Sequence, residues 1–265
     1  MNEPKSKAQQ SYFPEVRAVT VDDLRYALKQ GLSDFTRAPT YGLFFGGVYA
    51  LGGLLLLAGV TVLDMHWLSY PLVIGFALIG PFVATGLYEV SRRLERGQNL
   101  NWSGVFGVIW EQQRRELGWM AFVTLFIFWV WVYQARTIFT VFFGSKGFAS
   151  YDRFLEAIFT TTDGWTFLVV GHIVGAIISM VLFVLTVVSC PLLLEREVDF
   201  VTAMITSIRA VTGSPLVMLG WGLFVVLSVV LAAIPAFLGL LIVLPVLGHA
   251  TWHLYRRAVV EEQSS

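Results

Sequence analysis

Long runs of apolar residues alternate with short polar connections through most of this chain. Six of the runs are long enough to cross a bilayer as a helix, which takes about 20 residues. They cover residues 41–63, 67–88, 118–137, 166–191, 215–234 and 236–255. The pattern predicts an all-α, polytopic membrane protein with six transmembrane helices.

A segment with helical period and one apolar face precedes each outward-going span. The apolar residues of the first segment are Val21, Leu24, Leu28, Leu32 and Phe35. The second segment starts near Trp102, and the third follows Asp199, which is placed to cap it. Thr20 and Asp23 have the spacing of a capping box for the first. Helices of this kind lie along a membrane surface, and residues 154–159 predict a shorter one on the opposite surface.

The first and third surface segments align without a gap, from Asp23 against Asp199 to Pro39 against Pro215. Each of these prolines stands where a surface helix must turn into the bilayer. Prolines also recur in the three returning spans, at Pro81, Pro191 and Pro245. We interpret the chain as three like-oriented repeats, each an amphipathic surface helix followed by a transmembrane hairpin, and the last three prolines as candidate hinges.

This interpretation divides the chain into one membrane domain and two tails. The boundaries are a flexible cytoplasmic tail at 1–19, a single six-span domain at 20–260 and a tail at 261–265. The repeat units within the domain are about 20–97, 99–197 and 198–260.

Basic residues gather on one side of the predicted spans. Of the 18 Lys and Arg residues, all except Arg136, Lys146 and Arg153 precede the first span, follow the last, or lie in every second connection. Cytoplasmic loops carry the excess of Lys and Arg in membrane proteins. We therefore expect both termini in the cytoplasm, which agrees with an even number of spans.

Composition narrows the possible functions. Only 14% of the residues are charged, against about 25% in globular proteins, and the formal net charge is zero. No bulk field attracts nucleic acid, so we expect no nucleic-acid partner. Cys190 is the single cysteine, which excludes an intramolecular disulfide and a zinc site built on cysteine pairs.

The chain offers little catalytic chemistry. No Asp, Glu or Lys lies near the middle of a predicted span, which disfavours an ion-coupled transporter. The loops contain no nucleophile elbow, phosphate loop or paired-histidine zinc motif. We therefore expect a non-enzymatic protein without a cofactor.

Two histidines are the only candidates for binding a cofactor. His249 and His253 are four residues apart and share one helix face. That spacing could serve a metal, or one of them could bind a haem with a histidine from another helix. No third protein ligand is evident nearby, and the neighbouring Trp252 and Tyr255 resemble an interfacial belt. We expect a structural role for both.

Charged residues follow the returning spans on the predicted cytoplasmic side. The candidate functional residues on this face are Glu89, Arg92, Arg93, Glu195, Arg196, Arg256 and Arg257. They could bind lipid headgroups, pair across the face, or simply form solvated helix ends. The proline positions and the charges together indicate this face as the place where function resides.

Three stretches of the chain resemble a bacterial family known as domain of unknown function 2189. They read DLRYAL at 23–28, followed by Ala38 and Pro39; SCPLLLER at 189–196; and GHATWHLYR at 248–256. The resemblance spans nearly the whole chain. It implies a proteobacterial inner-membrane protein of undetermined activity and adds no catalytic residue.

The leading hypothesis is a non-enzymatic accessory, assembly or membrane-organising protein, whose partners are the lipid bilayer and another membrane protein complex. The alternative is a permease-like protein that moves a small apolar or amphipathic molecule through a pocket between the repeats. A third hypothesis is haem or metal binding at His249 or His253.

Overall fold

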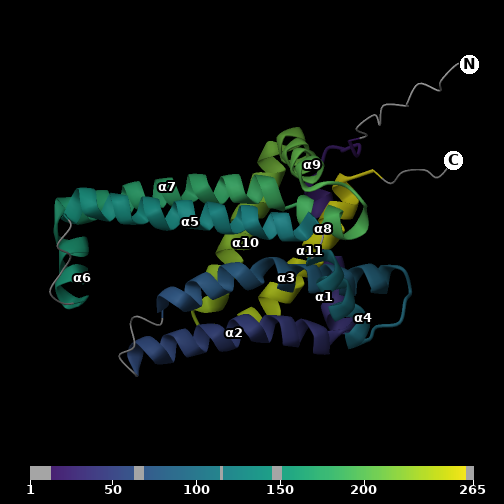
Figure 1. The fold of residues 1–265 in the computed structure, drawn as a ribbon, viewed down its shortest axis with the longest axis horizontal. Coiled ribbons are helices and arrows are strands. Elements are labelled where there is room, and N and C mark those ends of the chain that lie inside the picture. The colour runs from purple at the N-terminus through teal and green to yellow at the C-terminus, as the bar shows by residue number, and fades with distance from the viewer. Residues whose placement is uncertain (1–12, 63–68, 114–115, 145–150, 261–265) are drawn as a thin grey trace, which may run out of the picture.

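Every regular segment of the computed structural model is a helix in the residues that it describes, which are 13–62, 69–113, 116–144 and 151–260. The helices are α1 (Val21–Arg37), α2 (Pro39–Thr61), α3 (Ser69–Glu95), α4 (Trp102–Gln113), α5 (Glu116–Phe143), α6 (Tyr151–Thr160), α7 (Thr162–Thr186), α8 (Ser189–Glu195), α9 (Phe200–Gly213), α10 (Pro215–Ala233) and α11 (Leu240–Ala258) (Figure 1). The predicted all-α class is confirmed for these residues.

Four stretches of helix are long and apolar enough to cross a membrane, judged by length and composition within the described residues. They are Pro39–Gly59, Glu116–Phe143, Thr162–Glu195 and Pro215–Ala233. These correspond to the predicted first, third, fourth and fifth spans. The predicted second and sixth spans coincide with α3 and α11, and their crossing of the membrane stays a prediction. Residues 63–68, which connect the predicted first and second spans, lie outside the described residues.

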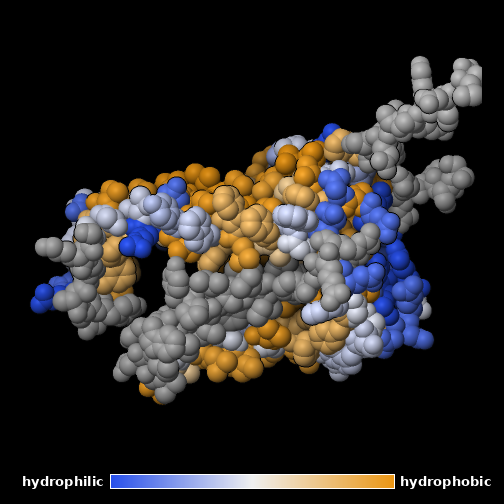
Figure 2. All heavy atoms as spheres, in the orientation of Figure 1, coloured by the Kyte–Doolittle hydropathy of each residue, from blue (hydrophilic) through white to orange (hydrophobic). Residues whose placement is uncertain are grey.

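Helices that differ in length and polarity occupy different positions along the long axis of the molecule (Figure 1). The three predicted surface segments form α1, α4 and α9, which lie together with α8 at the end where the segments next to both termini pair at Val16 and Val259. The predicted helix at 154–159 is α6, and it lies at the far end of a hairpin made by α5 and α7. Figure 2 shows hydrophilic residues at the end with α1, α4 and α9 and also around the far end near α6, with hydrophobic residues along the long helices between them.

The signals for helix starts are confirmed in detail. Thr20 and Asp23 form the capping box of α1, and Asp199 caps α9 with its side chain. Pro39 and Pro215 are the first residues of α2 and α10. The residue before each proline has almost the same backbone conformation, with φ −133° and ψ 55° at Ala38 and φ −147° and ψ 61° at Ser214. The two surface helices therefore turn into their long helices in the same way.

The returning helices differ from the expected spans at their ends. Ala236 and Phe237 have positive φ values of 49° and 63°, so they make a tight turn, and α11 starts only at Leu240. The predicted fourth span is interrupted between α7 and α8, just before Pro191. Ser207 of α9 covers this break, because its hydroxyl donates to the Val184 carbonyl at 2.7 Å and accepts from the backbone N–H of Val188 at 3.2 Å.

Of the other candidate hinges, Pro245 is buried inside α11 and Pro81 lies within α3. The contacts argue against a free hinge at Pro191. The Val184 carbonyl and the Val188 N–H, which flank the break, are both hydrogen-bonded to Ser207. Whether Pro81 and Pro245 bend stays a prediction.

The core lies at the end that holds the termini. Its largest fully buried side chains include Trp221, Trp252 and Tyr255. The α1 helix lies along α11 so closely that a Cβ on Gly31 would be 2.6 Å from the Val246 carbonyl oxygen. The segment before α1 also packs here, because the N–H of Arg17 donates to the Ala258 carbonyl at 2.9 Å. This part of the predicted tail is therefore held against the end of α11, and residues 1–12 and 261–265 lie outside the described chain.

Candidate functional site

A buried carboxylate organises the end of α3 that the sequence analysis expects on the cytoplasmic side. Glu89 is fully buried and pairs with Nη2 of Arg92 and Nε of Arg93, each at 2.6 Å. Spacings of three and four residues place both arginines on its helix face. Arg92 also donates to the Leu194 carbonyl at 3.0 Å, which ties α3 to α8. The explanation by solvated helix ends is wrong for Glu89, because its side chain does not reach solvent.

A second cluster joins the ends of α3, α8 and α11. Glu195 accepts from Nη1 of Arg256 at 3.0 Å, from Arg96 at 3.2 Å and from the Tyr255 hydroxyl at 2.6 Å. Arg256 also donates from Nε to Glu95 at 3.2 Å. The predicted pairing across this face is thus found for Glu195 and Arg256, and three helices that are far apart in sequence are fixed to one another.

The third cluster connects α1 with the end of α11. Asp23 accepts from Nε of Arg257 at 2.8 Å and from Nη2 of Arg17 at 2.9 Å. Burial alone would raise the pKa of Asp23. The hydrogen bonds from Arg17, Thr20 and Arg257 outweigh it and hold the pKa well below the usual value of 3.8.

A polar cavity of about 470 Å³ opens between these clusters and the start of α9. Its charged lining residues are Arg92, Glu116, Glu195, Arg196, Glu197 and Asp199. Several of these groups are engaged within the chain: Arg196 donates to the Val260 carbonyl at 2.7 Å, and Glu116 accepts from the backbone N–H of Phe200 at 3.0 Å. Acidic groups outnumber basic ones, so the cavity does not have the charge of an anion site.

The two candidate histidines contact different helices. Nδ1 of His249 is hydrogen-bonded to the Ser91 hydroxyl of α3 at 2.8 Å, whereas Nε2 of His253 lies 2.7 Å from Oδ2 of Asp34 on α1. Nε2 of His249 is buried without a hydrogen-bond partner among the described residues. No group of three His, Cys, Asp or Glu residues in the described chain is placed to hold a metal ion. The geometry therefore favours the structural role, with each histidine joining α11 to a neighbour.

Asp34 and Ser91 were missed by the sequence analysis, although Asp34 carried a signal. The residues that α1 buries are Asp23, Ala27, Gly31 and Asp34, at spacings of four and three. Meanwhile Val21 and Leu32 of the predicted apolar stripe are exposed. If a helix lies on a membrane surface, its apolar side is expected to meet lipid, so small and acidic residues at helical spacing were a signal for the side that packs on the protein. Ser91 gave no comparable signal.

The comparisons with known proteins agree with a membrane location. Residues 69–195 match the family DUF2189, described as a predicted integral membrane protein. The resemblance to domain of unknown function 2189 is therefore confirmed over the region from α3 to α8, and the protein is an integral membrane protein with several apolar helices. No curated protein and no solved structure matches the chain.

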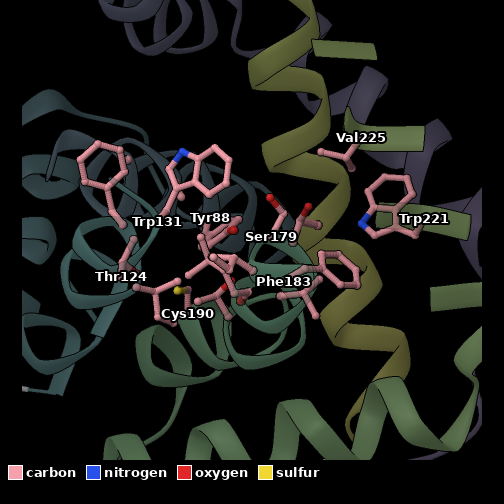
Figure 3. A pocket seen from close by; sticks show the side chains of 17 residues that line it. Tyr88, Thr124, Trp131, Ser179, Phe183, Cys190, Trp221 and Val225 are labelled. Carbon is pink, nitrogen blue, oxygen red and sulfur yellow. The ribbon is translucent and has the colours of Figure 1, made fainter. Parts of the chain in front are cut away.

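The part that matches DUF2189 also includes the long hairpin of α5 and α7. One face of α5 carries a stripe of aromatic side chains, each more than half exposed: Trp119, Phe122, Phe126, Trp129 and Tyr133. On its other side, the hairpin forms an apolar cavity of about 490 Å³ with α3 and α10. Tyr88, Trp131, Cys190 and Val225 are among the side chains around it (Figure 3).

Proposed function

We propose that this protein is a non-enzymatic accessory protein of the bacterial inner membrane, which binds a transmembrane helix of another membrane protein through α5. The observation that carries the proposal is the exposed aromatic stripe on that helix. The charged clusters at the cytoplasmic end hold the remaining helices in place, so that α5 is presented on a rigid support.

The spacing of the stripe is that of a helix-packing seam. Successive members are three, four, three and four residues apart, which is the a/d pattern that places side chains between those of a facing helix. Trp and Tyr normally concentrate where a membrane meets water. Trp129, however, lies close to the middle of α5 (Glu116–Phe143), where hydrocarbon alone would surround it. A neighbouring helix explains a large aromatic residue at that depth better than lipid does.

The topology is part of the same proposal. Six spans place both termini in the cytoplasm, and three like-oriented units each combine a surface helix with a hairpin. Three observations support it: the basic residues on one side, the surface helices and both termini at one end (Figure 1), and the matching turns at Ala38 and Ser214.

Purification from native membranes tests the proposed partner. The tagged protein in mild detergent should retain a membrane protein in stoichiometric amount. The double variant Phe126→Leu with Trp129→Leu should lose it, because both large rings are removed from the seam while the helix stays apolar. Phe224→Leu, on the exposed side of α10, is the matched control and should retain the partner. Absence of any stoichiometric partner, or its retention by the double variant, would refute the proposal.

The permease-like alternative is favoured by the apolar cavity between α3, α5, α7 and α10. Its hinges would be Pro81 and Pro245, which both lie within helices that border the cavity. A purified protein that retains a bound small molecule but no protein partner would support this function in place of the first.

A further inference from the structure

The cavity between the hairpin, α3 and α10 is lined mainly by apolar side chains, and hydroxyl groups gather toward one of its ends. Along α3 its lining runs from Gly80 to Tyr88, and along α5 from Thr124 to Trp131. Eight residues of helix are about 12 Å long, so the cavity is elongated in the direction of the helices. Residues that line the end near the charged clusters include Tyr88, Thr124, Thr186, Cys190 and Thr251, and those toward the other end include Ile127, Phe128, Trp131, Ile178 and Val225.

The hydroxyl groups at the polar end are not equivalent. Thr124, Thr186 and Thr251 each donate to the carbonyl four residues earlier in their own helix, at 2.9, 2.8 and 2.8 Å. They are therefore satisfied without a ligand. Tyr88 is 7% exposed, its side chain lies among those that line the cavity (Figure 3), and no hydrogen bond to its hydroxyl occurs within the described residues. Tyr88 is therefore the hydroxyl at this end of the cavity that is left to donate to a ligand.

We propose that this cavity binds one acyl chain of a membrane phospholipid, with the ester carbonyl oxygen accepting a hydrogen bond from Tyr88. The hydrocarbon chain would extend toward Trp131. A volume of about 490 Å³ lies within the range of roughly 300–1,000 Å³ for ligand pockets. Most of the lining is apolar, and Tyr88 offers a hydrogen-bond donor at one end of it. This arrangement suits a ligand with an acceptor at one end and a hydrocarbon chain, which describes an acyl ester.

The depth of Tyr88 agrees with this orientation. Tyr88 is seven residues, or about 10 Å along the helix, before the end of α3 at Glu95. An ester there would lie near the boundary between hydrocarbon and headgroups, and the headgroup would project beyond the cavity. At the depth of this cavity in the membrane, the surrounding bilayer itself supplies acyl chains. The inference does not depend on the proposed protein partner, because the aromatic stripe and the cavity lie on different sides of α5.

Photochemical labelling tests the site. The full-length protein is reconstituted in vesicles of phosphatidylethanolamine and phosphatidylglycerol that contain a small fraction of phosphatidylglycerol with a diazirine in the middle of one acyl chain. After irradiation, mass spectrometry compares labelling of Phe128, which lines the cavity, with labelling of Phe126, which is exposed to the bilayer. We expect Phe128 to be labelled in excess.

Variants separate a specific site from general lipid contact. Tyr88→Phe keeps the ring and should lower the ratio of Phe128 to Phe126 labelling about fivefold, as expected for one neutral hydrogen bond. Tyr133→Phe, on the exposed face of α5, is the control and should leave the ratio unchanged. Ser179→Trp, which places a large ring at the cavity lining, should also lower it.

Three outcomes would overturn the proposal. Equal labelling of Phe128 and Phe126 in the unmodified protein would show that the cavity holds no preferred chain. An unchanged ratio in Tyr88→Phe would remove the hydrogen bond that defines the site. Loss of the label on adding a long-chain isoprenoid quinone, with no loss on adding the same amount of unlabelled phosphatidylglycerol, would show that the site takes a ketone-bearing ligand instead of an acyl ester.

Discussion

Replacing Glu89 by Gln removes the negative charge that pairs with both Arg92 and Arg93. Glu89 is fully buried, whereas the side chains of Arg92 and Arg93 are 16% and 17% exposed. Breaking a fully buried ion pair costs about 3–5 kcal/mol, and partial solvation of the arginines lowers this to about 2–4 kcal/mol. Nε of Arg92 already lacks an acceptor in the described chain, so loss of the Glu89 charge would leave a second part of the guanidinium without its partner.

For a chain of this size, such a loss lowers the unfolding temperature by about 5–12 °C. The measurement is thermal unfolding of the purified protein in detergent, followed by tryptophan fluorescence and by size-exclusion chromatography. Asp22→Asn is the matched control, because Asp22 forms a pair of the same spacing with Arg25 at 2.9 Å, but with both side chains mostly exposed. It should shift the midpoint by about 1 °C or less. Similar small shifts in both variants would show that Glu89 is solvated and refute the proposed role of the buried cluster.

Three further predictions concern other parts of the same end. Gly31→Leu should lower stability by about 2–3 kcal/mol, because its side chain would displace α1 from α11; Gly107→Leu, with open space around it, is the control in the same melting assay. The lowered pKa of Asp23 means that its ionised form stabilises the fold, so this stability is complete above pH 3.8 and is lost as the pH falls below it. Asp23→Asn should flatten that part of the stability curve, and an unchanged curve would contradict the assignment. His249→Ala should leave the visible spectrum of the purified protein unchanged, whereas a Soret band lost in this variant would establish haem binding.

Local features of this fold were predictable because their causes are local. The capping box at Thr20, the cap at Asp199 and the helix starts at Pro39 and Pro215 depend on residues only a few positions apart. The apolar runs likewise gave the four helices that can cross a membrane.

The contacts of the candidate site could not be obtained in the same way. The partners of His249 and His253 lie on α3 and α1, which are 158 and 219 residues away in sequence. The sequence showed a shared helix face but not which helices would pack on it. Burial of Glu89 also depends on helix neighbours. In addition, exposure on α1 does not follow polarity, because the apolar Leu32 is exposed while Asp34 is buried.

Labelling of single cysteines tests the proposed six-span arrangement most directly, and the proposed cytoplasmic location of the charged clusters depends on it. One cysteine replaces Ser69, the first residue of α3, and another replaces Ser103 in α4, each in a Cys190→Ser background. An impermeant maleimide added to intact cells after removal of the outer membrane should react at position 69 and not at position 103, and inverted vesicles should give the opposite result. Reaction of both positions from the same side would contradict the six-span topology.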